Sequence, residues 1–402
     1  MSVLVSHPHV AAVSVGLANA LEREHKLAGY YTGIAFSLES QMGRLATRVA
    51  GRAPTLRNRL LAEIPPERLH AGRLLEVCAR LGGRVAAALG GRRPVYDALF
   101  STHDRAVSMA RWPGETTAVY AYEDGARRTF ERARRRDLER IWDLPLPHYL
   151  TIEETVRDES RRWPGASPSS PDPEPAWKRA TKDAELALAT KVSVASAFTK
   201  RSLERLDVRV PIAVGPYGFP IEGFAPKSAP PSGPFKVLAV GTQDLRKGTP
   251  YLLEAWRRAA LKDAELHIVG SLRLTKAFLD RYAGLFVHWP PVAKSELAHH
   301  YSGADLLAFP TLGDGFGLVI QEAMCAGTPV VTTPCGGGPE CITDGVDGWI
   351  VPPRDIDALV ERLRAAAADR DGTGAIGRAA RARAERSTWR EAGTAILRAL
   401  DL

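Results

Sequence analysis

The sequence predicts an α/β protein built on doubly wound parallel sheets, and two observations support this class. From residue 235 onward, short apolar runs rich in β-branched residues alternate with longer amphipathic stretches. Gly or Pro bounds most of these runs. Strands that alternate with helices through short connections are typical of right-handed βαβ units, whose parallel sheet is covered on both faces. We therefore expect residues 235–387 to form one such domain.

The individual elements of this domain follow from the same alternation. Short apolar runs predict strands at residues 236–240, 265–269, 285–288, 305–309, 328–332 and 348–351. The amphipathic stretches between them predict helices at residues 250–260, 295–301, 318–326 and 356–367.

The N-terminal part shows a similar but less regular pattern, which predicts a second α/β domain over residues 1–216. A strand at 3–5 leads into a helix at about 10–23, and further strands are expected at 94–101, 119–122 and 192–195. Segment 163–175 is rich in Pro and Ser and is interpreted as a surface loop of this domain. Gly and Pro recur without periodicity before residue 235, so residues 217–234 are the expected linker.

Composition places the chain among ordinary folded proteins. It has 402 residues, of which 45% are apolar and 25% charged, and its formal net charge is +8. These values argue against a disordered or disulfide-stapled chain, and the basic excess favours anionic partners without selecting one. The first residues lack the basic region of a signal peptide, and no apolar stretch is long enough to span a membrane. We expect a cytoplasmic protein.

The segment from Gly313 to Gly327 carries the strongest chemical signal. It follows a predicted strand, contains a glycine-rich turn and runs into a helix. Such a turn lets a ligand approach the backbone, and the first amides of the helix offer N–H groups to a phosphate or a polar sugar. Asp314 and Glu322, eight positions apart, suit two hydroxyl-bearing parts of one ligand. The turn alone leaves a purely structural role open, because similar turns occur throughout α/β proteins.

A second turn of this kind makes a binding cleft the better interpretation. Residues 240–248 also follow a predicted strand and precede a helix, and they include Arg246 and Lys247. The carboxyl ends of parallel strands share one edge of the sheet, so this basic pair is expected to reach an anionic ligand there.

Several ordered motifs resemble the retaining glycosyltransferases of family 4. They are Val240-Gly241, Lys247-Gly248, the acid pair around Gly315-Phe-Gly-Leu318, Gly327-Thr-Pro-Val-Val331, Gly336-Gly-Gly-Pro-Glu340 and Asp344-Gly-Val-Asp-Gly348. The resemblance implies the GT-B fold, in which two Rossmann-like domains face each other across a cleft. It also implies that the last helix, residues 388–402, crosses back to the first domain.

By this resemblance, Lys247 binds the diphosphate of a nucleotide-sugar donor, Glu322 the ribose, and the Asp314 turn the transferred sugar. The implied catalytic residues are Asp314, Lys247 and His103. The implied donor-binding residues are Gly241, Thr242, Arg246, Lys247, Gly315, Phe316, Gly317, Leu318 and Glu322. Two positions depart from the family pattern: Thr242 stands where Arg is usual, and Asp314 where Glu is usual.

The first domain would hold the acceptor, a carbohydrate or a lipid-linked sugar. His103 follows the strand expected at 94–101, where the family presents a histidine near the transferred sugar; a structural histidine fits this position equally well. The Arg-rich stretch 127–140, interpreted as a helix, would contact an anionic membrane at its inner face or form a solvated surface.

The sequence therefore predicts a retaining glycosyltransferase, or alternatively a nucleotide-sugar binder that has lost turnover. No metal is expected, because no Asp-x-Asp pair or His cluster is placed to hold one. The nucleotide sugar is a co-substrate, and no other cofactor is expected. Nucleic acid is not an expected partner, because a stacking aromatic motif and a groove-reading element are both missing from the sequence.

Overall fold

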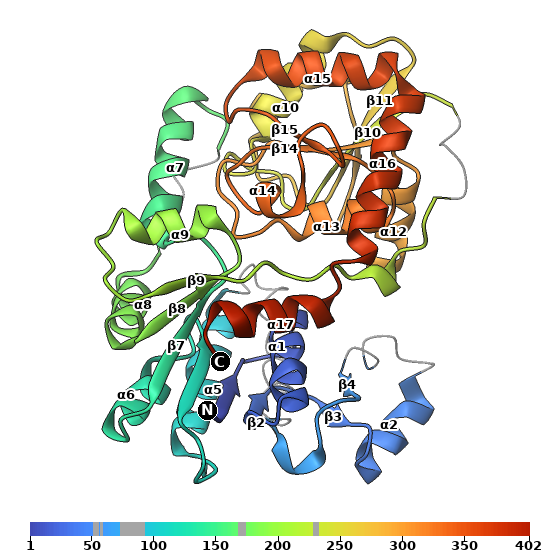
Figure 1. Cartoon of the computed structure of the whole chain (residues 1–402). Helices are drawn as coiled ribbons and strands as arrows, with labels where there is room; N and C mark the ends of the chain where they lie inside the picture. Colours follow the sequence, from blue (N-terminus) through green and yellow to red (C-terminus); the bar gives the residue numbers. More distant parts are fainter. Residues whose placement is uncertain (51–55, 57–58, 73–92, 168–173, 228–232) are drawn as a thin grey trace.

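The chain folds around two parallel β-sheets, each covered by helices on both faces (Figure 1). The structure, a computed structural model, describes residues 1–50, 56, 59–72, 93–167, 174–227 and 233–402. Parts of the predicted Pro/Ser-rich loop (168–173) and of the predicted linker (228–232) lie outside these residues. Two Rossmann-like units confirm the expected α/β class, whereas the expected domain limits stay a prediction.

The first sheet has the strand order β5-β2-β1-β6-β7-β8-β9. Its strands are β1 (Val3–Ser6), β2 (Leu27–Thr32), β5 (Leu69–Ala71), β6 (Ala118–Tyr122), β7 (Glu139–Leu144), β8 (Lys191–Val194) and β9 (Ile212–Val214). Adjacent strands pair in parallel, for example Val3 with Ala118 and Ile141 with Lys191. A separate pair, β3 (Phe36–Ser37) and β4 (Leu60–Leu61), lies beside it.

Helices cover both faces of the first sheet. The N-terminal helices are α1 (Ala12–Arg23), α2 (Gln41–Ala50), η1 (Pro66–Arg68), α5 (Arg93–Met109), α6 (Arg127–Arg135), α7 (Tyr149–Arg162), α8 (Ala176–Leu188), α9 (Ala197–Glu204) and η2 (Ile221–Gly223). Alternate residues of each strand face opposite sides. Val3 and Val5 join the core under α1, while Leu4 joins the core that contains Val107 of α5 and Phe130 of α6.

The second sheet has the order β12-β11-β10-β13-β14-β15. Its strands are β10 (Phe235–Val240), β11 (Ala264–Val269), β12 (Val287–Trp289), β13 (Leu306–Phe309), β14 (Val330–Thr332) and β15 (Trp349–Ile350). Its helices are α10 (Thr249–Ala259), α11 (Lys276–Leu279), η3 (Asp280–Tyr282), α12 (Lys294–Ser302), α13 (Leu318–Cys325), α14 (Gly338–Cys341), α15 (Ile356–Ala368) and α16 (Arg370–Glu385). All six predicted strands occur here, although β12 begins two residues later than expected.

Segment 94–101, expected as a strand, is instead the first half of α5. The buried residues of this segment and its continuation are Leu99, His103, Asp104 and Val107. This three-to-four-residue spacing places them on one side of a helix, whereas a strand would bury every second residue. The strand prediction was wrong because it used the run 94–100 alone. The helical spacing becomes visible only when the buried positions after residue 101 are included.

The Arg-rich helix is shorter than expected. Helix α6 ends at Arg135, and Arg140 lies in β7. Arg132 donates hydrogen bonds to the carbonyls of Ser108 (2.9 Å) and Ala110 (2.5 Å). Part of the positive charge is therefore engaged within the protein, and residues 134–136 remain exposed.

Helix α7 and the residues directly after it contact the second domain, so residues 163–166 are not a surface loop of the first domain alone. Its last turn carries Glu159, fully buried, which accepts hydrogen bonds from the Tyr251 hydroxyl (2.6 Å) and from Arg354 Nε (2.6 Å). Beyond the helix, Trp163 packs edge-on against Tyr251, and Ala166 belongs to the core of the second sheet. Figure 1 shows α7 running along the upper domain.

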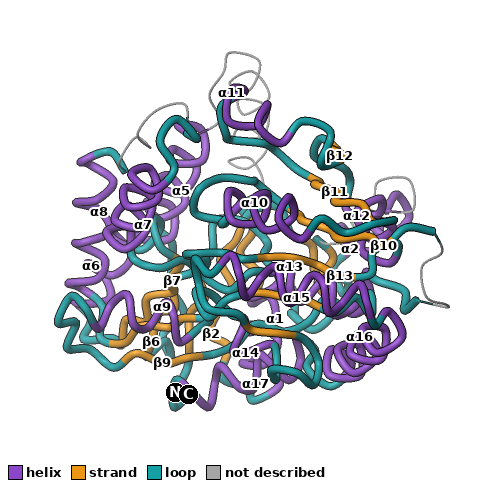
Figure 2. Tube along the Cα trace, turned by 90° about the horizontal axis from the view of Figure 1, so that it is seen from above, coloured by secondary structure: helices purple, strands orange, loops and turns teal. Residues whose placement is uncertain are grey.

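The chain also returns at its end to the first sheet. Helix α17 (Trp389–Ala399) begins with a capping box formed by Thr388 and Glu391, and it packs against α1 (Figure 1). A Cβ on Gly393 would lie 2.4 Å from the carbonyl oxygen of Gly16, so the two helices touch through their backbones. As a result, the two termini lie close together (Figure 2).

Candidate functional site

Two turns at the carboxyl edge of the second sheet form the candidate site. One follows β10 and the other follows β13, and hydrogen bonds join them. The Leu312 amide donates to the carbonyl of Arg246 (2.8 Å), and Arg246 Nη1 donates to the carbonyl of Gly313 (2.5 Å). The structure thus brings together the two turns in which the sequence analysis placed the binding residues.

Close approach of the two turns requires glycine at position 248. Gly248 has φ +71° and precedes α10, and an added Cβ would lie 1.9 Å from the carbonyl oxygen of Pro310. Any other residue would push the β10 turn away from the β13 turn. Lys247, the residue before it, is held over the Phe309 ring, with Nζ 4.9 Å from the ring centre.

Lys247, Arg246 and Asp314 form a charged cluster between the turns. Lys247 Nζ makes an ion pair with Asp314 Oδ2, and Arg246 Nη1 lies 3.9 Å from Asp314 Oδ1. The Asp314 side chain is 11% exposed, and its amide donates to the carbonyl of Cys335 (2.9 Å) in the loop after β14. Two cations beside one carboxylate leave the cluster with a positive charge to offer an anionic ligand.

Burial lowers the pKa of Lys247, while the Asp314 carboxylate counteracts this effect. Arg246 lowers the pKa further by repulsion. A buried ammonium that is only partly compensated gains from any additional negative charge nearby. A diphosphate placed between Lys247 and Arg246 would supply that charge.

The start of α13 adds free N–H donors next to this cluster. Gly317 (φ +85°) precedes the helix in a left-handed conformation that favours glycine. Within the described part of the chain, the amides of Leu318 and Val319 have no hydrogen-bond acceptor. Free amides at a helix start attract anions, because the helix dipole adds to their own polarity.

Glu322 lies on α13 with a partner of its own. Its Oε2 accepts a hydrogen bond from the Tyr301 hydroxyl (2.9 Å), and burial raises its pKa. No hydrogen bond or ion pair described in the structure joins it to Lys247 or Asp314. The predicted ribose contact therefore remains a prediction, with the Tyr301 bond holding the carboxylate in place.

The remaining predicted donor residues differ in exposure. Gly241 (φ +102°) and Thr242 lie in the partly exposed turn after β10. Phe316 is buried and packs against Tyr217, with ring centres 5.1 Å apart, so its side chain anchors the turn. The Leu318 side chain is 51% exposed.

The first domain closes directly onto the Asp314 turn, through residues that the sequence analysis missed. Ser196 Oγ donates to the carbonyl of Gly315 (2.5 Å), and Thr199 Oγ1 lies 3.3 Å from the same oxygen. The Ala197 amide donates to Oε1 of Glu340 (2.7 Å), a residue of α14. A Ser-x-x-Thr cap was the available signal, but sequence could not show that its hydroxyls reach across the domains.

His103 lies at the carboxyl end of β1, although it is carried by α5 and not by a strand end. Its Nε2 is 3.0 Å from Ser6 Oγ, and burial, with His9 nearby, lowers its pKa to about 4. The imidazole is therefore neutral at physiological pH. No described hydrogen bond or ion pair links His103 to Lys247 or Asp314, so its catalytic role remains a prediction.

The described residues contain no group of three or more His, Cys, Asp or Glu side chains arranged to hold a metal ion. Each of their helices is too short or too polar to cross a bilayer.

Residues 234–369 match the family model for glycosyl transferases group 1. A D-inositol 3-phosphate glycosyltransferase from Arthrobacter sp. is 30% identical over 278 residues, which cover 63% of this chain and 64% of that enzyme. The sulfoquinovosyl transferase SQD2 of Arabidopsis thaliana is 38% identical over 104 residues, which cover 26% of this chain and 20% of that protein. The chain thus spans less than two thirds of the length of these relatives.

Solved structures resemble the chain over its whole length. Anabaena HepE, determined with UDP and glucose, has a TM-score of 0.60 at 15% identity and covers 100% of this chain and 99% of its own. Sucrose-phosphate synthase from Thermosynechococcus elongatus also has a TM-score of 0.60, at 19% identity, and covers 97% of this chain and 96% of its own. The chain therefore has the GT-B fold of two Rossmann-like domains, and its match to the family model lies within the second of them.

Proposed function

We propose that the protein is a glycosyltransferase that moves a sugar from a nucleotide-sugar donor to a hydroxyl acceptor. The observation that carries this proposal is the convergence of Lys247, Arg246 and Asp314 at the start of α13, inside the region that matches the family model. UDP-glucose is the first donor to test, because HepE has been determined in complex with it.

The charges of the site suit this chemistry. When the bond between the anomeric carbon and the diphosphate oxygen breaks, negative charge grows on the diphosphate and positive charge on the sugar. Lys247, Arg246 and the free amides of α13 would stabilise the diphosphate, and the Asp314 carboxylate, paired with both cations, would face the sugar. The acceptor oxygen then bonds to the anomeric carbon, and its proton is released with the nucleoside diphosphate.

Retention of the anomeric configuration and independence from metal ions are part of the proposal. Both rest on the resemblance to glycosyltransferase family 4. The anomer of the product, read by NMR, tests retention, and activity after treatment with EDTA tests metal independence. The acceptor is proposed to be a carbohydrate or a lipid-linked sugar, held by the first domain near Ser6 and His103.

We also propose that the exposed residues Arg134, Arg135 and Arg136 contact the inner face of an anionic membrane. Their positive charge would attract acidic headgroups. Arg132 and Arg140 contribute less, because both are bonded to backbone carbonyls of the first domain.

Nucleotide release from UDP-, GDP- and ADP-sugars, with and without simple sugar acceptors, tests the function. Wild-type protein should release nucleotide from at least one donor, and Lys247→Ala should lower kcat/KM about a hundredfold or more, equivalent to about 3 kcal/mol. Lys276→Ala is the matched control, because Lys276 is an exposed lysine that pairs with Asp280 in the same segment. Tight donor binding without nucleotide release would instead favour the non-catalytic binder, for which the Thr242 departure is the motivation.

A further inference from the structure

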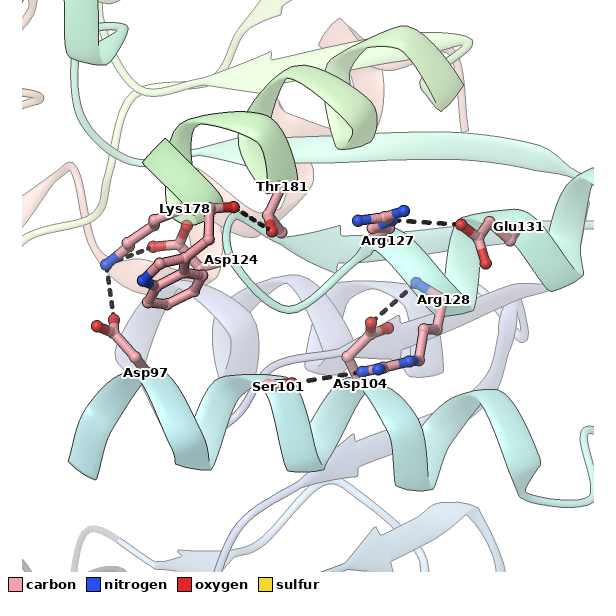
Figure 3. A pocket seen from close by; sticks show the side chains of 10 residues that line it. Asp97, Ser101, Asp104, Asp124, Arg127, Arg128, Glu131, Lys178 and Thr181 are labelled. Atoms are coloured by element: carbon pink, nitrogen blue, oxygen red, sulfur yellow. Dashed lines mark hydrogen bonds and ion pairs between the residues drawn. The ribbon is translucent and has the colours of Figure 1, made fainter. Parts of the chain in front are cut away.

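A cavity of about 270 Å³ lies in the N-terminal domain (Figure 3). Its lining residues all fall between residues 97 and 181 and so do not belong to the turns that carry Lys247 and Asp314. Helices α5, α6 and α8 and the turn after β6 form its walls. The lining residues are Asp97, Ser101 and Asp104 of α5; Asp124; Arg127, Arg128 and Glu131 of α6; and Trp177, Lys178 and Thr181 of α8. Nothing in the donor chemistry proposed above uses these side chains.

The cavity lies next to the edge of the first sheet that faces the second domain. Its wall at Asp124 belongs to the turn that follows β6. A Cβ on Gly125 in this turn would lie 3.3 Å from the Pro8 side chain and 3.8 Å from the Phe100 carbonyl, so the turn is wedged between the β1 loop and α5. Ser196, at the same edge, contacts Gly315 of the donor turn. The cavity wall at Asp124 and the contact of Ser196 with the donor turn therefore belong to the same edge of the first sheet.

The lysine of the cavity is already neutralised. Lys178 Nζ lies 2.8 Å from Asp97 and 3.1 Å from Asp124. Figure 3 shows its ammonium group between these two carboxylates. These two contacts leave little positive charge for an anionic ligand at this end of the cavity.

The first amides of α6 are also occupied. The buried Glu185 carboxylate accepts from the amides of residues 124 (2.9 Å), 126 (2.9 Å) and 127 (3.2 Å). Asp104 accepts from the amides of residues 128 (2.8 Å) and 129 (2.9 Å). The start of α6 is therefore closed to a phosphate or carboxylate. The four carboxylates that line the cavity also outnumber its three cations, so the cavity favours a neutral ligand.

What remains in the cavity suits a sugar. The Arg128 guanidinium lies 3.3 Å from the Ser101 hydroxyl and offers further N–H donors, and the carboxylates offer acceptor lone pairs. Trp177, 56% exposed, offers an apolar aromatic face of the kind that packs against C–H groups. At about 30 Å³ for each water, the volume equals about nine waters, which is enough room for one monosaccharide.

We propose that this cavity binds one neutral sugar unit and serves as a subsite for a part of the acceptor that is remote from the reacting hydroxyl. The proposal rests on the proposed function, because it assumes a carbohydrate acceptor. Binding at a remote unit holds the acceptor in ground state and transition state alike. Loss of the subsite should therefore raise the acceptor KM and leave release of nucleotide without acceptor unchanged.

Saturation-transfer NMR with the methyl α-glycosides of glucose, galactose and mannose tests the subsite, with glucuronate as the anionic comparison. Trp177→Ala removes the aromatic wall, and Ser101→Trp fills the cavity from an exposed position on α5. Tyr96→Ala is the control, because Tyr96 is 55% exposed on the same helix and does not line the cavity. Thermal melting of each variant verifies that it is folded.

At least one neutral glycoside should bind to wild type and to Tyr96→Ala, about tenfold more weakly to Trp177→Ala, and not detectably to Ser101→Trp. The proposal is overturned if no neutral glycoside binds to wild type or if only glucuronate binds. It is also overturned if the saturation-transfer signal of the glycoside is equal in wild type and in both folded cavity variants. The donor assay is read separately on the same variants. If no nucleotide is released from any nucleotide sugar in that assay, the proposed function is wrong. Binding of glycosides to the cavity can still be measured in that case, so the two proposals are tested separately.

Discussion

A methyl group at position 315 is expected to separate the two domains at the donor turn. An added Cβ on Gly315 would lie 1.7 Å from the carbonyl oxygen of Pro145 and 3.1 Å from the Cα of Leu146, both in the first domain. These are backbone atoms, so no side-chain rotation can relieve the contact. The φ of Gly315 lies outside the left-handed region, so Gly315→Ala acts through this contact and not through backbone strain.

The required movement follows from the geometry. Cβ atoms essentially never approach another heavy atom closer than 3.0 Å, so the two backbones must separate by at least 1.3 Å. The bond from Ser196 Oγ to the Gly315 carbonyl, 2.5 Å long, would be stretched or lost. A displacement of about 1 Å at reacting groups can lower a rate about a hundredfold. We expect a loss of this size in kcat/KM, while the cores of both sheets remain intact.

Release of nucleotide from the donor sugar measures the effect, and circular dichroism verifies the fold. Gly114→Ala is the matched control, because a Cβ there has no heavy atom within 4 Å. If Gly315→Ala is folded and transfers sugar at the wild-type rate, the closed contact between the domains has no role in the reaction, and this reasoning is refuted.

Three further variants test separate parts of the structure. Glu159→Gln removes the negative charge that pairs with Arg354. It should lower the free energy of unfolding, measured in urea, by about 2 kcal/mol, a moderate loss because Arg354 is partly exposed to water. An unchanged unfolding midpoint would contradict the bridging role of α7. Burial lowers the pKa of His103 from 6.5 to about 4, so between these pH values the unfolded chain takes up a proton that the folded chain does not. The free energy of unfolding therefore falls by about 3 kcal/mol as the pH decreases from above 6.5 toward 4. His103→Gln should flatten the pH dependence of unfolding over this range, and an unchanged slope would argue against a buried neutral imidazole. Replacement of Arg134 and Arg135 by Glu should reduce sedimentation with phosphatidylglycerol vesicles, and equal sedimentation would remove them from the proposed membrane contact.

The second domain was largely predictable from the sequence because its strands are continuous buried runs. Val237 to Val240, for example, is buried throughout, and Gly241 follows it directly. In the sequence, a parallel strand that is covered on both faces is a continuous run of apolar residues. The charged cluster was predictable for a related reason: Lys247 and Asp314 both follow strand ends, and parallel strands bring their carboxyl ends to one edge.

The rest depended on contacts between distant residues. Nothing near Glu159 in the sequence indicates that its partner is Arg354, 195 residues away. The same holds for the hydroxyl of Ser196 and the carbonyl of Gly315, which are 119 residues apart. The strand expected at 94–101 failed because a short apolar run fits either a strand or a helix until its buried partners are known.

A crystal structure of the protein with UDP tests the central claim most directly. We expect the diphosphate between Lys247 Nζ and the first amides of α13, with the Asp314 carboxylate displaced toward the space for the sugar. A diphosphate bound elsewhere, with the Lys247–Asp314 pair unchanged, would contradict the proposed donor site.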